Sequence, residues 1–246
     1  MVDQPGNHLQ LEAWFCESTR LTVFPLGSAQ PRQSGWWEQL VGTPPEQRQE
    51  LPLSGEVQEI GPFEGHQLTV ATAPLVMNVI LRASPGPVLP WGSLTFANGV
   101  ELLRKLTKQW FEVGPPVWRI ALGLVVLSPV ESRRLGYKLL QPYLSTVKLD
   151  PETSSDFFYQ INRRRRSRTI SSIEINRLSK WSVAEWQQIL LPSHPQAAAK
   201  GVTLRVELDI NTAPEHQSEL PRADLDALSN ELVDLGVEIL KSGDIP

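Results

Sequence analysis

The stretch Val202-Thr-Leu-Arg-Val-Glu-Leu-Asp-Ile210 alternates strictly between apolar and polar side chains. Successive side chains of a β-strand point to opposite faces of the sheet, so a period of two predicts a half-buried strand. Its aliphatic side chains face a core and its charged side chains face outward. Asp209 is therefore interpreted as part of the polar face, because the residues after it lack the rest of a calcium-binding loop.

An amphipathic helix is predicted downstream of this strand, over about residues 223–240. Its apolar residues recur at steps of three and four, which is the spacing of one helix face. They are Leu225, Leu228, Leu232, Leu235 and Ile239. Packing of this stripe on a sheet is the simplest interpretation, and a homodimer seam is the alternative.

Upstream, further elements follow from apolar runs and from helix-start signals. Three capping-box patterns, at Asn98–Glu101, Ser128–Glu131 and Ser182–Glu185, predict helix starts, the last for a helix over 182–190. The interval 27–50 is rich in Gly, Pro, Gln and Ser and predicts a long irregular segment, in which Trp36–Leu40 could form one helical turn. Strands are expected at 9–16, 21–26, 55–60, 66–73, 76–82, 117–127, 156–165 and 169–181.

This grouping of strands favours an α+β fold with a largely antiparallel sheet and helices on one face. The second half has the element order of a ferredoxin-like unit followed by a closing helix. Gly114-Pro115-Pro116 suggests a boundary between an N-terminal α+β half, 1–115, and a C-terminal α+β half, 116–246. One continuous domain is the alternative.

The net charge of −4 is an average over three unlike segments. Residues 1–115 hold 7 Lys/Arg and 11 Asp/Glu, residues 116–192 hold 12 and 6, and residues 193–246 hold 4 and 10. The segments therefore carry net charges of −4, +6 and −6. The plainest account is that the acidic C-terminal segment neutralises the basic middle one.

The sharpest local feature is a run of arginines, which comprises Arg163, Arg164, Arg165, Arg166 and Arg168. In an extended chain these side chains point to both faces, so the run predicts a strand end, a hairpin tip or an arm. Three interpretations are open. The arginines pair with carboxylates of the acidic ends, such as Asp224, Asp226, Glu231 and Asp234, they bind nucleic acid or another polyanion, or they bind an acidic protein partner.

Tryptophans form a second candidate site. Trp36, Trp37 and Trp91 lie in segments rich in Pro and Gly, so we expect an exposed edge that binds a protein partner. No catalytic residue, metal site or cofactor motif is identified, because the four histidines are scattered and Cys16 is the only cysteine.

The sequence predicts a cytoplasmic protein. The longest apolar stretch, 120–127, is far shorter than a membrane span, and residues 1–15 do not read as a secretory signal. A single cysteine agrees with a reducing compartment, and its apolar neighbours predict that Cys16 is buried in a strand.

Several segments resemble those of a known family in their order and composition. They are Phe24-Pro25, the Trp- and Pro-containing run 36–45, the Gly-flanked run 65–80, Arg119-Ile-Ala-Leu-Gly123, and the strand at 202–209 with its acidic terminal helix. With these, the chain resembles an uncharacterised, sporadically distributed bacterial family of about this length. That resemblance supplies no catalytic residue, and its patchy distribution implies an accessory or defence-associated role that depends on a partner.

Three functional hypotheses follow. The first is a non-enzymatic interaction or adaptor subunit of a bacterial multi-protein system, without a membrane partner. The second is a nucleic-acid-binding accessory protein that uses Arg163–Arg168. The third is an enzyme whose site the sequence does not identify.

Overall fold

The computed structural model describes residues 8–27, 35–84, 92, 94–187 and 200–244. Within these residues, nine strands form one sheet in the spatial order β2-β3-β4-β5-β1-β6-β9-β8-β7, and all neighbours are antiparallel. The strands are β1 (Phe15–Pro25), β2 (Gln47–Leu51), β3 (Glu56–Phe63), β4 (His66–Ala73), β5 (Val76–Arg82), β6 (Val117–Val130), β7 (Phe158–Arg166), β8 (Glu174–Gln187) and β9 (Lys200–Thr212).

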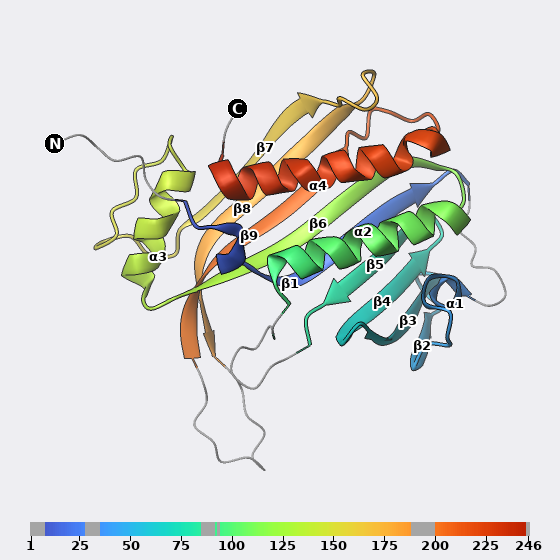
Figure 1. The fold of residues 1–246 in the computed structure, drawn as a ribbon, viewed down its shortest axis with the longest axis horizontal. Coiled ribbons are helices and arrows are strands. Elements are labelled where there is room, and N and C mark those ends of the chain that lie inside the picture. Colours follow the sequence, from blue (N-terminus) through green and yellow to red (C-terminus); the bar gives the residue numbers. More distant parts are fainter. Residues whose placement is uncertain (1–7, 28–34, 85–91, 93, 188–199, 245–246) are drawn as a thin grey trace, which may run out of the picture.

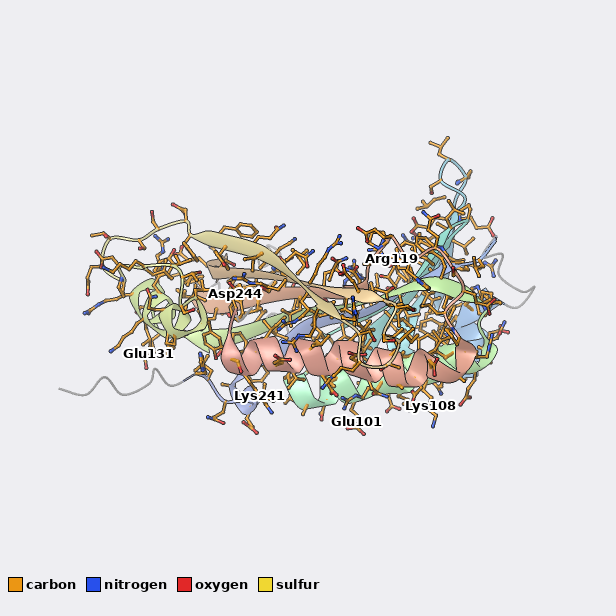
Figure 2. The ribbon with its side chains drawn as sticks, turned by 90° about the horizontal axis from the view of Figure 1, so that it is seen from above. Glu101, Lys108, Arg119, Glu131, Lys241 and Asp244 are labelled. Carbon is orange, nitrogen blue, oxygen red and sulfur yellow. The ribbon has the colours of Figure 1, made fainter. Side chains whose placement is uncertain are left out.

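The helices lie on one face of this sheet (Figure 1). In Figure 2, α2 and α4 run along the same side of the strands. On that side α1 packs against α2 and β3, and α3 packs against β8 and β9. The predicted α+β class, with an antiparallel sheet and helices on one face, is therefore confirmed. The helices are α1 (Gly35–Val41), α2 (Phe96–Val113), α3 (Arg133–Leu140) and α4 (Leu225–Ser242), with short 3₁₀ turns at Leu11–Ala13, Gln141–Tyr143 and Arg222–Asp224.

The core lies between the helices and the sheet. The strand predicted from its alternation is β9, and its aliphatic side chains at 204, 206, 208 and 210 are buried on the helix side. The predicted apolar stripe of the terminal helix is buried there too, on α4. Gly236 faces the sheet as well, and a Cβ at this position would make ordinary van der Waals contact, at 3.5 Å, with side-chain atoms of Leu124 and Leu208. The stripe therefore packs on the sheet.

The helix predicted over 182–190 is wrong in its described part, because residues up to Gln187 continue β8. Ser182 pairs with Arg205 and Glu185 with Val202, so the capping-box pattern lies inside a long hairpin. Pairing along the whole of β9 outweighs a local helix-start signal. The second half has the order β-α-β-β-β-α, so the ferredoxin-like order is not formed.

The helix start predicted at Ser128 is also wrong, because β6 continues to Val130. The pairing of β1 with β6 ends at Phe15, which lies opposite Leu127. Beyond this point one side of β6 has no β1 neighbour, so Pro129 is tolerated there. The next helix, α3, begins at Arg133 instead, where the Ser132 hydroxyl accepts the N–H of Leu135 at 3.2 Å.

In the first half, the two strands expected at 9–16 and 21–26 are a 3₁₀ turn followed by the single strand β1. In the interval expected to be irregular, the helical turn expected at 36–40 is α1, and residues 47–51 form β2. The three strands expected between residues 55 and 82 are confirmed as β3, β4 and β5. Since β1 lies between β5 and β6, the sheet passes through both halves of the chain.

Candidate binding face

The face of the sheet opposite the helices carries the polar half of the strand alternation. On β9 this half includes Arg205, Glu207 and Asp209. The pairing register places Gly123 of β6 between Asp209 and Arg20 of β1. In Figure 2 the labelled Arg119 lies on this side, away from α4. Residues of the five adjacent strands β5, β1, β6, β9 and β8 line this helix-free face.

A cavity of about 280 Å³ lies at the centre of this face. Gly123 forms part of its lining, and a Cβ at this position would stand 3.2 Å from Nε of Arg20. The missing side chain therefore leaves room for the guanidinium of Arg20. The lining residues are Ser18, Arg20, Ile80, Arg82, Gly123, Leu124, Val125, Leu178, Lys180, Glu207, Leu208 and Asp209.

The two carboxylates of this cavity are already engaged. Asp209 accepts a hydrogen bond of 2.9 Å from Nδ2 of Asn211, and Glu207 accepts bonds from Lys180, at 3.3 Å, and from Arg205. Burial raises the pKa of Glu207, but the hydrogen bonds and charges of Arg205 and Lys180 outweigh it and hold the pKa below its ordinary value. Both acids are therefore satisfied within the protein.

The cationic side chains of the cavity are less well satisfied. Nη2 of Arg20 lies 3.8 Å from Asp209, beyond hydrogen-bonding distance, and its buried Nε has no acceptor among the described residues. Arg82 is exposed and makes no hydrogen bond or ion pair within the described part of the chain. The polar groups of this cavity that lack a hydrogen-bond partner are thus mainly arginine N–H groups.

Two further cavities continue the first one towards the end of β8 and β9. A cavity of about 320 Å³ shares Arg82 with the central one, and a cavity of about 550 Å³ shares Glu185 and Trp186 with the second. The indole of Trp186 lies over Gly201, where a Cβ would be 2.8 Å from the ring. We call these three adjoining cavities the groove.

A hydrogen-bonded network of polar side chains borders the groove on its other side. Arg119 donates to the carbonyl of Thr212 at 3.1 Å and to Oδ1 of Asn211 at 3.0 Å. Asn176 donates to the same oxygen at 3.0 Å and accepts from Asn162 at 2.9 Å. These side chains satisfy one another, which holds β6, β9, β8 and β7 in register.

The predicted arginine run forms the end of the edge strand β7 and the turn after it. Four of its five arginines make ion pairs with carboxylates, and Arg166 is exposed without one among the described residues. On the helix side, Arg163 binds Asp244 and Arg165 binds Glu238. The other pairs are Arg164 with Glu174 and Glu215, and Arg168 with Glu231.

Glu231 is the buried anchor of the turn after β7. Its carboxylate accepts the Ser167 hydroxyl at 2.7 Å and the backbone N–H groups of Arg168 and Thr169 at 2.7 and 3.1 Å. Burial raises its pKa, but these hydrogen bonds outweigh that effect and lower it. Of the partners expected from the sequence, Glu231 is used, whereas Asp234 pairs with Arg104 of α2.

Arg177 is a buried cation that the sequence did not single out. It is 2% exposed on the helix side of β8, beside Arg163 and Arg165. Burial lowers its pKa, and the charge of Arg165 lowers it further, while Glu238, at 3.8 Å, opposes this shift. The acidic helix α4 thus neutralises several arginines at once.

The expectation of an exposed tryptophan edge is wrong for two of its three members. Trp36 and Trp37 are 3% and 1% exposed, because α1 packs them against α2 and β3. Their backbone N–H groups both donate to the buried carboxylate of Glu59, at 3.1 Å each. Trp91, the third member, lies outside the described residues.

Cys16 is fully buried in β1, as predicted, and burial raises the pKa of its thiol to about 12.

Across the described ranges, no three His, Cys, Asp or Glu side chains gather as metal ligands would. In the same ranges, no helix has the length and apolar character needed to cross a bilayer.

Sequence reasoning missed the groove. The alternation in β9 did indicate a polar face at Arg205, Glu207 and Asp209, but it left those residues facing solvent. Arg20 and Arg82 carry no local signal, because their common position depends on strand pairings between distant segments.

The chain matches no protein-family model, and it has no significant match among curated proteins.

Proposed function

We propose that this protein is a non-enzymatic interaction module, a subunit of a multi-protein assembly, which binds a partner polypeptide across its helix-free sheet face. The observation that supports this proposal most is the groove. Its cavities adjoin one another across β5, β1, β6, β9 and β8, and they combine aliphatic with charged lining. A polypeptide offers the same mixture of apolar and charged groups in an extended form.

The charges of the groove favour a polypeptide over a nucleic acid. Arg20, Arg82, Lys180 and Arg205 are accompanied by Glu17, Glu207 and Asp209 on the same face. Phosphate backbones require a largely cationic surface, and carboxylates beside them are repelled. The arginine run, which is the strongest basic segment, is largely paired with carboxylates. Both observations support the adaptor hypothesis over the nucleic-acid one.

The test is affinity purification of the tagged protein from its native cells, followed by reconstitution with the purified partner. Val125→Asp and Leu178→Asp place a charge in the central cavity and should each weaken binding at least about tenfold. Leu75→Asp is the matched control, because Leu75 is 72% exposed in the turn between β4 and β5. It should bind as the wild type does.

Circular dichroism and the melting temperature establish that each variant is folded. Unchanged affinity in both cavity variants would exclude the groove as the binding face. Failure of any protein to copurify in stoichiometric amount would also count against an assembly subunit.

A further inference from the structure

We infer that the central cavity receives a carboxylate of the partner polypeptide, an aspartate or glutamate side chain, which Arg20 and Arg82 hold between them. This inference rests on the proposed function, since it specifies what the helix-free face binds. It starts from an imbalance within the cavity. Its acids accept hydrogen bonds from protein donors, whereas both arginines retain donors without acceptors.

The sheet register brings the two arginines to one site. Arg20 pairs with Ile80 across β1 and β5, and Ser18 pairs with Arg82. Arg20 and Arg82 are therefore diagonal neighbours on one face, a relation that separates Cα atoms by roughly 7–8 Å. Long side chains at this separation can converge on one small anion. The side chain of Arg20 lies over Gly123, where a Cβ would crowd its guanidinium.

The chemistry of the surroundings favours a carboxylate on an aliphatic stem. A guanidinium donates two parallel hydrogen bonds to a carboxylate, which a lysine cannot do. Ile80 and Val125 line the same cavity and offer apolar contact to the methylene groups of an acidic side chain. Glu207 and Asp209 lie beside the arginines, so a phosphate with two negative charges would meet more repulsion than a carboxylate would.

The first experiment measures carboxylate binding by nuclear magnetic resonance on the full-length ¹⁵N-labelled protein. The probe is Nα-acetylglutamate amide, and its uncharged counterpart is Nα-acetylglutamine amide, at equal ionic strength. We expect the Nε–H signal of Arg20 and the backbone amide of Gly123 to shift saturably with the acid only. Arg20→Gln and Arg82→Gln should each weaken this binding at least about tenfold, since a charge-assisted hydrogen bond is lost.

Arg104→Gln is the matched control, because Arg104 lies on α2, on the opposite side of the sheet. Its binding should equal that of the wild type. The inference is overturned if the acid causes no shift at tens of millimolar, if the amide causes the same shift, or if inorganic phosphate binds more tightly than the acid.

The reconstituted complex separates the two proposals. Loss of partner binding in Val125→Asp but not in Arg20→Gln or Arg82→Gln would overturn the carboxylate inference and leave the groove as the binding face. Unchanged partner binding in all of these variants would overturn the proposed function itself.

Discussion

The guanidinium of Arg163 donates two hydrogen bonds, each of 2.9 Å, to the carboxylate of Asp244, whose side chain is 2% exposed. The hydroxyl of Tyr159 donates to the same carboxylate at 2.6 Å, and the N–H of Asp244 donates to the carbonyl of Tyr143 at 2.8 Å. The residues that follow α4 are thereby fastened to the edge strand β7. The arginine run thus has a structural role that its sequence left open.

Asp244→Asn should lower the free energy of unfolding by about 1–3 kcal/mol, because an amide cannot accept both guanidinium hydrogen bonds. Urea denaturation followed by circular dichroism measures this loss. Glu215→Gln is the control, since Glu215 and Arg164 form an exposed pair that solvent screens, and its effect on stability should be much smaller than that of Asp244→Asn. Equal losses in the two variants would contradict a special role for the buried carboxylate.

Stability should fall in acid. The hydrogen bond from Arg163 lowers the pKa of Asp244, and that from Arg165 lowers the pKa of Glu238. Groups with a lowered folded-state pKa stabilise the protein fully above their ordinary values, which are 3.8 for Asp and 4.5 for Glu. That stability is lost as the pH falls below these values towards the folded-state ones, because the unfolded chain then binds more protons.

Free energies of unfolding measured from pH 7 down to about pH 3 test this prediction. The combined variant Glu238→Gln and Asp244→Asn removes both groups, so its stability should decline less steeply than that of the wild type. Parallel curves for the two proteins would show that other groups govern the acid dependence.

Glu59→Ala should destabilise the protein by about 2–3 kcal/mol, because the N–H groups of Trp36 and Trp37 lose their buried acceptor. Thermal unfolding and the emission of the indoles report the effect. Glu50→Ala is a suitable comparison, since Glu50 is 69% exposed beside Arg48. If Glu59→Ala melts at the same temperature as Glu50→Ala, then this carboxylate does not fix α1.

Cys16 should resist alkylation in the native protein. Its thiol is fully buried and its pKa is about 12, so the reactive thiolate is scarce and inaccessible at pH 8. Mass spectrometry after iodoacetamide treatment should find it unmodified in buffer and modified in urea. Rapid labelling without denaturant would mean that β1 opens readily.

The nucleic-acid hypothesis predicts a measurable effect at the exposed arginines. If the proposed groove is the binding face, the double variant Arg164→Ala and Arg166→Ala should bind oligonucleotides no differently from the wild type, because neither arginine lines the groove. Fluorescence anisotropy at several salt concentrations provides the measurement. Binding by the wild type that falls steeply with salt and disappears in the variant would support the nucleic-acid hypothesis instead.

Local sequence patterns correctly predicted the elements whose structure depends on residues that are close together in the sequence. The alternation from Val202 predicted β9, and the leucine spacing from Leu225 predicted α4, since both patterns reflect burial on one face. The helix starts predicted at Ser182 and Ser128 are wrong, because both residues lie in strands that long-range pairing extends. A helix cap worth about 0.5–2 kcal/mol cannot outweigh a full ladder of pairings.

The site depended still more on distant contacts. The acidic C-terminal segment was expected to neutralise the arginine run, but the sequence could not identify Asp244 and Glu238 as partners. Composition placed Trp36 and Trp37 in a loop, whereas their burial follows from α1 docking on α2. Arg20 and Arg82 line one cavity because β1 and β5 pair, which no single segment encodes.

The position of β1 in the middle of the sheet has a consequence for synthesis on the ribosome. Leu21 of β1 pairs with Leu122 of β6, and Leu122 pairs in turn with Ile210 of β9. The nascent chain can form the local hairpins of β3, β4 and β5 early and add β1 to the edge of β5, but the other edge of β1 waits for β6, and β6 waits for β9. The centre of the sheet is therefore completed late in translation, after its β3–β5 flank can already have paired.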